Sequence, residues 1–303
     1  MEDSISAVED SLNQLALGKS VNRPRGHDIA GPGAYLAHMR AAAYGQGVSG
    51  FKTYTACAGS FRFHVYLFST ETGQLLTVIE ANRLGQLRTG AATAVSVRHM
   101  ARSDSSTVGL LGTGFQASTQ LEAACKVRTI SEVKVYSPTV EHRVAFASRM
   151  TETLDVKVTP VDSPREAVEA ADVLITVTAS RTPVFDGKWL RSGTHVAAVG
   201  GANEYVRELD DECVQRADLL VVDDLAQAKI ECGELLMPAS RGLIMWEQVR
   251  ELWQIVSGAV PGRNLDDDVT IFKSLGMALW DIAVAKVVYD RAVARGVGVT
   301  MGN

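Results

Sequence analysis

Several features that would assign a chain to a special class are absent from this sequence. No apolar run approaches the roughly 20 residues that a helix needs to cross a bilayer. The four cysteines are scattered and include no C-x-x-C pair, so neither a disulfide framework nor a metal site is expected. The first residues are acidic and lack the basic and apolar regions of a secretion signal. We therefore expect a cytoplasmic protein with free thiols and no membrane partner.

An excess of charge of one sign is also missing. The chain of 303 residues has 30 Lys and Arg against 35 Asp and Glu, a net charge of −5, with no basic or acidic block. Because a nucleic-acid surface needs clustered basic residues, no nucleic-acid partner is expected. Hydrophobic residues make up 46% of the chain, which is enough for the cores of two ordinary domains.

The most informative stretch that is present runs from Ser106 to Leu121. A small and apolar run is followed by a G-x-G-x-x-A pattern and then by helical spacing, as in a strand, a tight turn and a helix. Small residues are needed there for the sharp turn, for a pyrophosphate to approach the backbone, and for close helix packing. The alternative is an ordinary glycine turn. The expected dinucleotide contacts are Gly112, Thr113, Gly114, Phe115, Gln116 and Ala117.

Downstream of this turn, strand and helix patterns alternate. Strands are predicted at 107–111, 132–136, 156–161, 173–178, 195–199 and 219–222, and helices at 116–126, 139–152, 163–170, 206–216 and 225–230. Such alternation predicts an α/β fold with a parallel, doubly wound sheet. We therefore expect a Rossmann dinucleotide-binding domain over residues 104–274.

The flanking regions have a different pattern. A helix is predicted at 2–17, a loop or edge strand at 21–27, and antiparallel strands at 34–39, 48–55, 61–68 and 74–80. Helices are predicted at 90–101 and 246–256, and a long one at 277–294 is expected to return to the first region. Residues 1–103 and 275–303 should thus form one discontinuous α+β domain, interrupted by the predicted Rossmann domain.

The end of the second Rossmann strand bears on the choice of dinucleotide. An NAD-binding fold usually has Asp or Glu there, but this chain has Ser137. Thr139, His142 and Arg143 follow and are suited to a 2′-phosphate, whereas Glu141 is not. Both NAD and NADP remain open, with NADP slightly favoured. Two further cofactor contacts are expected at the ends of later strands, Thr178 and Gly200.

Two cations lie where the local pattern does not require them. Lys52 is in a strand between aromatic and β-branched neighbours, and Arg88 precedes the helix predicted at 90–101. An arginine at a helix N-terminus opposes the macrodipole, which suggests another role. The alternative for each is a structural salt bridge.

Several ordered motifs resemble the ornithine cyclodeaminase/mu-crystallin family. The main ones are Arg88-Thr89-Gly90-Ala91-Ala92, the glycine turn at 112–117, and Phe272-Lys273-Ser274-Leu275-Gly276-Met277-Ala278. The resemblance implies a homodimer in which the Rossmann domain is inserted into a substrate-binding and dimerisation domain, here residues 1–103 and 275–303. It also implies chemistry on α-amino, α-imino or α-keto acids with NAD(H) or NADP(H). It also implies that Lys52 transfers the proton and that Arg88 and an earlier arginine, Arg25 or Arg23, hold the substrate carboxylate, with Arg25 preferred. A buried lysine beside arginines has a depressed pKa, which suits that task.

The sequence departs from the family pattern at two places. Cyclodeaminases have a catalytic Asp in a G-G-D segment, but this chain has Gly200-Gly201-Ala202-Asn203, which argues against cyclisation. Asn203 is expected to contact the substrate instead. Arg40 replaces a residue of a Met-Pro-Ala segment, which suggests a second carboxylate on the substrate, as in iminosuccinate. The alternative is that Arg40 points to solvent.

The resulting prediction is a cytoplasmic homodimeric NAD(P)H-dependent reductase of a small α-imino or α-keto acid, which forms an L-amino acid. The alternatives are a cyclodeaminase-type lyase with bound NAD and a non-enzymatic cofactor- or ligand-binding protein.

Overall fold

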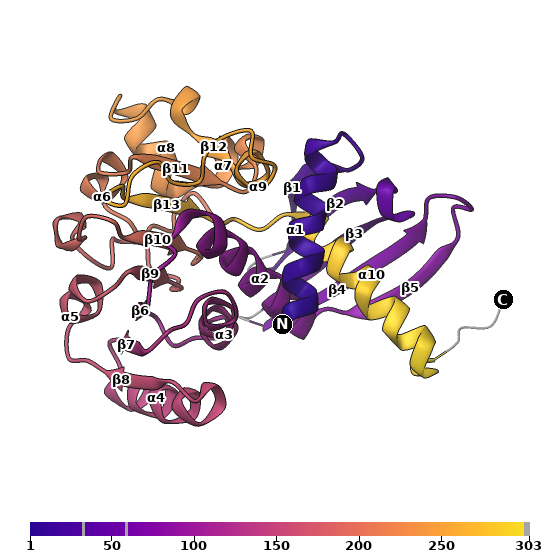
Figure 1. Ribbon diagram of the computed structural model, residues 1–303. Helices are drawn as coiled ribbons and strands as arrows, with labels where there is room; N and C mark the ends of the chain where they lie inside the picture. Colours follow the sequence, from indigo (N-terminus) through magenta and orange to yellow (C-terminus); the bar gives the residue numbers. More distant parts are fainter. Residues whose placement is uncertain (32–33, 58–59, 300–303) are drawn as a thin grey trace. The chain divides into compact units, whose positions relative to one another are not determined.

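The computed structural model describes residues 1–31, 34–57 and 60–299, and it divides into two compact units (Figure 1). The parallel-sheet unit consists of Met1 and Thr89–Gly276, and the antiparallel-sheet unit of Glu2–Arg88 and Met277–Asn303. The division falls inside helix α2 (Asn82–Met100), not at residue 103. The second half of α2 is held in the parallel-sheet unit, where Thr93 Oγ1 donates a 2.5 Å hydrogen bond to Gln120.

The antiparallel-sheet unit is built on five strands whose spatial order follows the chain. They are β1 (Val21–Gly31), β2 (Ala34–Ala43), β3 (Val48–Cys57), β4 (Ser60–Ser69) and β5 (Leu75–Glu80). A short 3₁₀ turn, η1 (Tyr44–Gln46), joins β2 to β3. The segment expected to be a loop or an edge strand is the edge strand β1. This sheet confirms the antiparallel pattern expected of the first region.

One face of this sheet is covered by helices. Helices α1 (Glu2–Ala16) and α10 (Ala278–Arg295) contact each other, and α10 also contacts β1, β2, β3 and β4 (Figure 1). Because successive side chains of a strand point to opposite faces, only alternate residues meet the helices. Met39, Val65 and Leu67 are such residues, and each is completely buried. The side chain of Asn22 on β1 accepts a hydrogen bond from the backbone N–H of Leu279, which anchors the start of α10.

The parallel-sheet unit confirms the predicted doubly wound α/β fold. Its sheet has the order β12-β11-β13-β10-β9-β6-β7-β8, and every pairing is parallel. The strands are β6 (Thr107–Leu111), β7 (Glu132–Tyr136), β8 (Lys157–Pro160), β9 (Val173–Thr176), β10 (His195–Ala198), β11 (Leu219–Val222), β12 (Arg250–Glu251) and β13 (Thr270–Lys273). The strand order reverses beside β6, between β9 and β7, which is where such folds bind ligands.

Helices cover both faces of the parallel sheet. They are α3 (Ala117–Val127), α4 (Val140–Leu154), α5 (Pro164–Glu169), α6 (Asp211–Gln215), α7 (Leu225–Glu231), α8 (Gly233–Ser240) and α9 (Leu252–Val256), with 3₁₀ turns η2 (Gly187–Trp189) and η3 (Trp246–Gln248). Alternate strand residues supply two cores, one with Val108 and Leu110 under α3 and α4, and one with Leu174 under α5 to α8. The all-apolar strands are therefore buried on both sides, as parallel strands usually are.

Three predicted elements differ in the structure. Helix α2 begins at Asn82, so Arg88 lies within it and the helix-end argument for this residue was wrong. The helix predicted at 206–216 is only α6, because residues 206–210 form a loop that directs Glu208 toward the strand ends. The helix predicted at 246–256 is interrupted by β12, which pairs with β11, so that only α9 is helical after it.

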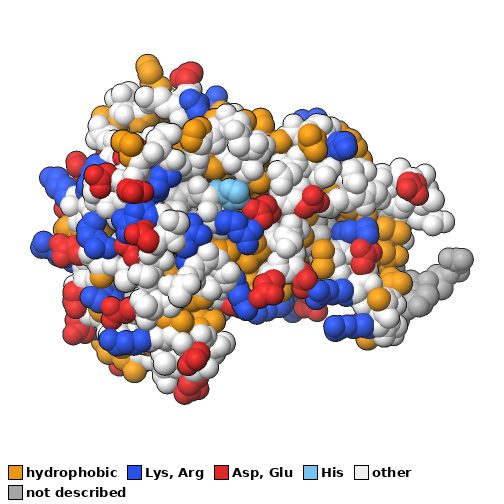
Figure 2. Space-filling model, viewed as in Figure 1, with side chains coloured by type: hydrophobic (Ala, Val, Ile, Leu, Met, Phe, Trp, Pro, Cys, Tyr) orange, Lys and Arg blue, Asp and Glu red, His pale blue; other side chains and the backbone are white. Residues whose placement is uncertain are grey.

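Charged side chains are mixed on the face drawn in Figure 2, where Lys and Arg lie among Asp and Glu. None of the helices in the described part of the chain has the length and apolar character needed to span a bilayer. Among residues 1–31, 34–57 and 60–299, no group of three or more His, Cys, Asp or Glu side chains is arranged to hold a metal ion.

Candidate active site

Lys52 lies in the middle of β3 and is buried on the face that meets α10. Only 3% of its surface is exposed. Its ammonium lies 5.2 Å from the centre of the Phe63 ring and 6.0 Å from that of Tyr54. The first turn of α2 is also close, because a Cβ added at Gly85 would lie 3.8 Å from Lys52 Nζ. An ammonium group in such a place needs a partner of opposite charge.

That partner is Asp281, in the first turn of α10. Lys52 Nζ donates a hydrogen bond of 3.1 Å to Asp281 Oδ1, and Arg88 Nε donates one of 3.0 Å to the same oxygen. Asp281 is completely buried, and Arg88 is 7% exposed. The structure thus joins the two cations singled out in the sequence through one carboxylate. The macrodipole of α10 also favours the ionised carboxylate at this helix start.

The three groups leave unused hydrogen-bonding atoms. Arg88 Nη1 and Asp281 Oδ2 are buried and have no hydrogen-bond partner among the described residues. With two cations and one anion, the cluster carries a net positive charge. A buried site of this kind is completed by an anion that accepts hydrogen bonds, such as a carboxylate.

The surroundings of Lys52 also set its acidity. Burial, the nearby charge of Arg88 and that of Arg25 lower the pKa of Lys52 to about 8, although Asp281 acts in the opposite direction. Desolvation is the largest cause, because an ammonium group loses hydration when it is buried. Lys52 can therefore exchange a proton close to neutral pH, as expected from the sequence.

A β-bulge in β1 separates the roles of Arg23 and Arg25. Arg23 pairs with Arg40 and Gly26 with His38, so two residues of β1, at 24 and 25, lie opposite Met39 alone. A Cβ at Gly26 would point at the His38 ring. Positions 23 and 26 therefore lie on the same face of the sheet as Arg40 and His38. Arg25 lies on the opposite face, which also carries Met39 and Lys52. Arg25 is half-buried and its charge acts on Lys52, whereas Arg23 is exposed.

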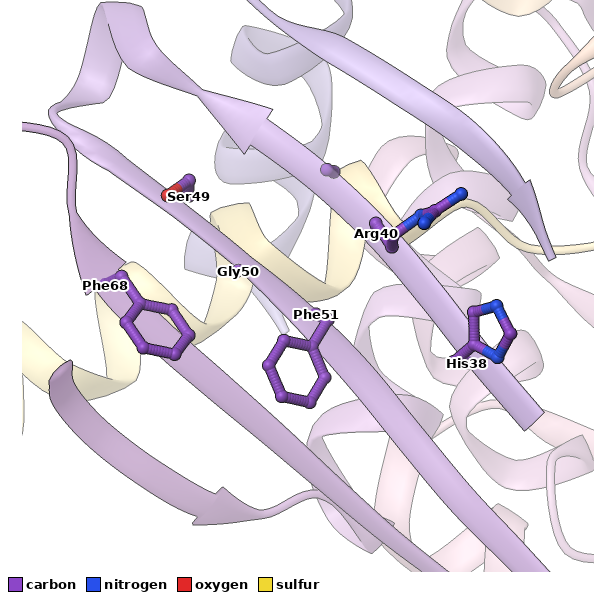
Figure 3. Close-up of a pocket in the computed structure, with 7 residues that line it drawn as sticks. His38, Arg40, Ser49, Gly50, Phe51 and Phe68 are labelled. Atoms are coloured by element: carbon purple, nitrogen blue, oxygen red, sulfur yellow. The ribbon is translucent and has the colours of Figure 1, made fainter. Parts of the chain in front are cut away.

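Arg40 is not part of this cluster. Its position on β2 pairs with Phe51, whereas Met39 pairs with Lys52, so Arg40 and Lys52 project from opposite faces of the sheet. Arg40 is exposed and lines an open pocket of about 330 Å³ with neighbours that include His38, Ser49, Phe51 and Phe68. Figure 3 shows these side chains, with α10 behind the sheet. The extra positive charge expected beside Lys52 is therefore not supplied by Arg40 of the same chain.

In the parallel-sheet unit, the glycine turn connects β6 to α3. Gly112 has a φ of +110°, and a Cβ there would lie 2.7 Å from the Val177 carbonyl oxygen. Gly114 is exposed, and a Cβ there would meet no atom within 4 Å. Ala117 is completely buried at the start of α3. These three positions fit a dinucleotide, since the turn is tight, one residue leaves its outer side open, and the helix packs closely.

The other residues of the turn lie around this opening. Phe115 is 61% exposed and Gln116 is partly buried. Thr113 Oγ1 donates a 3.2 Å hydrogen bond to Ser137 Oγ, which connects the turn to the loop after β7. These side chains are thus placed where a dinucleotide would cross the strand ends.

In the loop after β7, one of the three residues predicted to suit a 2′-phosphate is already engaged within the chain. Arg143 is buried, and its guanidinium donates hydrogen bonds to the Ser137 carbonyl oxygen and to Asp162 Oδ1. It also stacks over the Tyr136 ring. Arg143 therefore holds the loop in shape, whereas Thr139 and His142 are exposed.

The ends of β9 and β10 lie next to this turn in the same sheet. Thr178 is partly buried and Gly200 is buried, and their backbone N–H groups both donate to the Glu208 carboxylate. Asn203 is exposed, and its side-chain oxygen accepts a hydrogen bond from the Tyr205 N–H. Ala202 is partly buried and offers no titratable group.

Asp281 is the main residue that the sequence prediction missed. A signal was present, because Asp281 is the only charged residue in a buried stretch from Met277 to Ala285. A carboxylate in such surroundings is rarely left without a cation. Its partners are 229 and 193 residues away in the chain, so spacing gave no indication of them.

Comparison with known proteins identifies the family of the chain. The model of the ornithine cyclodeaminase/mu-crystallin family matches residues 1–296. The chain belongs to this family. It is 40% identical to a Delta(1)-pyrroline-2-carboxylate reductase of Bacillus cereus, over 77% of this chain and 72% of the relative.

Several solved structures resemble the chain over nearly its full length. A Delta(1)-pyrroline-2-carboxylate reductase of Thermococcus litoralis in complex with NADH and L-proline has a TM-score of 0.94 and 33% identity, covering 98% of this chain and 95% of that one. An archaeal alanine dehydrogenase dimer with bound NAD has a TM-score of 0.93 and 35% sequence identity, and the match covers 100% of this chain and 94% of that one. The iminosuccinate reductase of Paracoccus denitrificans in complex with NAD⁺ has a TM-score of 0.92 and 30% sequence identity, and the match covers 98% of this chain and 93% of that one. Within the ornithine cyclodeaminase/mu-crystallin family, the chain thus groups with the oxidoreductases.

Proposed function

We propose that this chain reduces the C=N bond of a small α-imino acid with NAD(P)H and so forms an L-α-amino acid. The observation that carries the proposal is the buried cluster of Lys52, Arg88 and Asp281, with Arg25 on the same face of the sheet. Pyrroline-2-carboxylate and the imine of pyruvate are small α-imino acids, and both are ketimines because their imine carbon carries two carbon substituents. Relatives named for such reductions share the fold and a large part of the sequence.

The substrate carboxylate is assigned to Arg88 and Arg25. Arg88 uses Nε to bind Asp281, and its buried Nη1 lacks a partner among the described residues. A buried unpaired donor costs about 1–3 kcal/mol, and a carboxylate would remove this cost. Arginine suits the task because its planar guanidinium can bind both oxygens of one carboxylate.

The proton is assigned to Lys52. A nicotinamide dinucleotide, bound at the glycine turn, is the source of the hydride for the imine carbon. The Lys52 ammonium donates a proton to the imine nitrogen, which becomes the amine, and Lys52 then regains a proton from water. A pKa of about 8 leaves Lys52 mainly protonated at neutral pH, yet acidic enough to donate.

The proposal leaves both NADH and NADPH open as the source of the hydride. The similar structures contain NAD, NAD⁺ or NADH. The loop after β7 has Ser137 in place of a carboxylate, so it does not repel a 2′-phosphate, but Arg143 is already engaged. The KM values for NADH and NADPH with one substrate decide the preference.

A dicarboxylic substrate is the second candidate. It is favoured by the likeness to the iminosuccinate reductase of Paracoccus denitrificans. Within one chain Arg40 lies on the face opposite Lys52, so another group would have to bind the second carboxylate.

A substrate panel tests the proposal. Pyruvate, glyoxylate and oxaloacetate with ammonia or methylamine, and pyrroline- and piperideine-2-carboxylate alone, are incubated with NADH or NADPH, and dinucleotide oxidation is followed. We expect turnover of at least one monocarboxylic imino acid. Lys52→Met should lower kcat by about 10²–10⁴-fold, the usual contribution of a general acid, and keep NADH binding.

Arg40→Ala is the matched control for the panel. It removes a cation from the face of the sheet opposite Lys52. The rate with each monocarboxylic and each dicarboxylic substrate is therefore expected to be the same for Arg40→Ala as for the wild type. A selective loss on oxaloacetate with ammonia would instead support the dicarboxylic candidate. No turnover of any imino or keto acid by the wild-type chain would contradict the proposed reduction.

Two other functions are less well supported. A cyclodeaminase needs a base for the substrate amine, but Ala202 and Asn203 offer no carboxylate in the segment after β10. Net consumption of NAD(P)H during the reaction would separate a reductase from that lyase. A non-enzymatic binding protein has no need of a lysine with a depressed pKa, and turnover in the panel would exclude it.

The proposed assembly is a homodimer formed through the open face of the antiparallel sheet. This face carries Phe51 stacked on Tyr66, with ring centres 4.6 Å apart, and Phe68 at 6.1 Å from Phe51. All three are only partly buried in the single chain. Aromatic side chains are enriched in interfaces, and the similar archaeal alanine dehydrogenase is a dimer.

A further inference from the structure

A buried ionic network ties together the ends of three neighbouring strands in the parallel-sheet unit. Lys273, at the end of β13, donates hydrogen bonds to the carbonyl oxygens of Gly200 and Gly201, at 2.6 and 3.1 Å, and to Glu234 Oε1 at 3.2 Å. All three ammonium protons are thus used. Lys273 and Glu234 are 0% and 1% exposed. The network is fully engaged, unlike the Lys52 cluster.

Glu208 completes the network from the other side. Its Oε1 accepts a hydrogen bond of 2.6 Å from the Thr178 N–H, and its Oε2 accepts bonds of 2.8 Å from the Gly200 N–H and from Thr176 Oγ1. Its own backbone N–H donates to Glu234 Oε1 at 3.1 Å. Both backbone polar atoms of Gly200 are therefore held by charged side chains that are themselves buried.

The fit around Gly200 leaves no room for a side chain. A Cβ there would lie 2.1 Å from the Thr178 carbonyl oxygen and 2.5 Å from the Glu208 carboxyl group. The turn at Thr178, after β9, and the turn at Gly200, after β10, are consequently held at a fixed distance from each other. This locked pair lies beside β6, where the strand order reverses and where open α/β sheets bind their ligands.

The cost of the network points to a task beyond folding. Two carboxylates and one ammonium are removed from water, and buried ion pairs of this kind contribute little stability compared with apolar packing. The strand pairings of β9, β10 and β13 are already made by backbone hydrogen bonds. What the ions add is a fixed backbone position just beyond the strands.

We propose that Lys273, Glu208 and Glu234 are positioning residues, which hold the Thr178 and Gly200 turns as a rigid seat for the nicotinamide half of the dinucleotide. The proposal rests on the use of a nicotinamide dinucleotide in the proposed function. In a Rossmann fold the pyrophosphate binds at the glycine turn and the adenosine at the strand that follows it, here β7. The nicotinamide half would then lie on the other side of β6, at the ends of β9 and β10. A preorganised seat lowers the ordering cost of binding that half.

The test compares two ligands that share the adenosine and the pyrophosphate. NADH has the nicotinamide, and ADP-ribose lacks it. Their Kd values are measured by calorimetry on the full chain, for the wild type and for two variants. Thr176→Val removes one hydrogen bond to Glu208. The double variant Lys273→Met with Glu234→Gln removes the Lys273–Glu234 ion pair and leaves Glu208 held by the Thr176 hydroxyl and by the backbone N–H groups of Thr178 and Gly200.

We expect NADH to bind about 10-fold more weakly to each variant, which corresponds to the net loss of one hydrogen bond. ADP-ribose should keep its affinity within about twofold, since its contacts lie elsewhere. Gly114→Ala is the matched control, because it blocks the pyrophosphate approach and should weaken both ligands together. Equal losses for both ligands in the network variants, or no loss of NADH affinity, would overturn the proposal.

The outcome is separable from that of the substrate panel. If the wild type reduces no imino acid but the NADH and ADP-ribose affinities split as expected, the positioning role stands and the proposed reaction falls. If imino acids are reduced but no split occurs, the reaction stands and the positioning role falls. If the wild type binds neither ligand, the positioning role is overturned as well. Because Thr176→Val alters only one hydrogen bond, it keeps the test decisive even if the double variant does not fold.

Discussion

At the scale of single residues, the charge state of Lys52 is decided by opposing neighbours. Burial and the charges of Arg88 and Arg25 disfavour the ammonium form, and Asp281 favours it. The balance gives a pKa of about 8 instead of the ordinary value near 10.5. One carboxylate, located on the helix that follows the parallel-sheet unit in sequence, therefore controls whether Lys52 is an acid at neutral pH.

Substitution of Asp281 tests this control. Asp281→Asn keeps the shape of the side chain but removes its charge, so the pKa of Lys52 should fall. The proposed reduction requires protonated Lys52, and kcat/KM should therefore decline with rising pH through that pKa. In the wild type the decline is expected near pH 8, and in the variant about one pH unit or more lower. Profiles from pH 6 to 10 measure both midpoints, and unchanged midpoints would show that Asp281 does not set the acidity of Lys52.

At the scale of elements, the two glycines of the β6–α3 turn have different tasks. Gly112 is constrained by its positive φ and by the Val177 carbonyl group, whereas Gly114 has open space outside it. The first glycine is therefore required by the fold, and the second is proposed to leave room for the dinucleotide.

A pair of alanine variants separates these tasks. Gly112→Ala should destabilise the chain by about 1–3 kcal/mol, because Ala adopts this φ with strain and its Cβ meets a carbonyl group. Gly114→Ala should leave the melting temperature within about 1 °C of the wild type. The same variant should weaken NADH binding by about 10-fold or more. Thermal unfolding and calorimetry give both quantities, and the reverse pattern would refute the assignment of the turn.

His195 connects three elements of the parallel-sheet unit. Its ring in β10 lies 3.2 Å from Ser96 Oγ in α2 and 2.9 Å from Thr270 Oγ1 in β13. Burial, together with the charges of Arg263 and Arg128, lowers the pKa of His195 to about 3. The imidazole is therefore neutral in the folded chain. Since the unfolded chain takes up a proton near pH 6.5, stability is lost as the pH falls below that value.

The loss has a calculable size. When the pH falls from 6.5 to 5, protonation of His195 in the unfolded chain should lower the free energy of unfolding of the wild type by about 2 kcal/mol, at about 1.36 kcal/mol per pH unit. His195→Gln is less stable than the wild type at pH 7, but it lacks this titration. Urea unfolding at pH 7 and pH 5 should thus show the stability gap between the two proteins narrowing by about 2 kcal/mol. A constant gap would mean that His195 is not kept neutral by the fold.

At the scale of the whole molecule, the chain separates two chemical tasks into two units. The parallel-sheet unit carries the glycine turn and the strand ends suited to a dinucleotide. The antiparallel-sheet unit carries Lys52, Arg88 and Asp281 on its helix-covered face. Its other face carries the partly buried aromatic residues Phe51, Tyr66 and Phe68 and is the proposed dimer surface.

The oligomeric state tests the proposed dimer surface. Phe51→Asp places a charge in the centre of the aromatic stack, and it should convert the dimer into a monomer at micromolar concentration. Size-exclusion chromatography with light scattering measures the mass. Val140→Asp, at a 51% exposed position on α4, is the control and should remain dimeric. A dimeric Phe51→Asp protein, or a monomeric wild type, would place the interface elsewhere or remove it.

Much of this molecule follows from the sequence alone, because the relevant signals are local. Alternation of apolar segments specifies the parallel-sheet unit, and the strand 219–222 was predicted to the residue. The G-x-G-x-x-A turn is recognisable because a sharp turn and a close helix need small residues in fixed order. Lys52 could be singled out because a lysine between aromatic and β-branched neighbours of a strand is uncommon. Arg88 was singled out by a helix-end argument that the structure contradicts, since α2 begins at Asn82.

Other features were decided only by the tertiary structure, because they depend on contacts between distant segments. Asp281 meets Lys52 and Arg88 across 229 and 193 residues. A one-residue bulge in β1 turns Arg25 toward Lys52 and leaves Arg23 on the other side. The pairing of β2 with β3 sends Arg40 to the opposite face, and the insertion of β13 between β10 and β11 brings Lys273 to the Gly200 turn. Local propensity fixes which elements form, but register and packing determine which side chains meet.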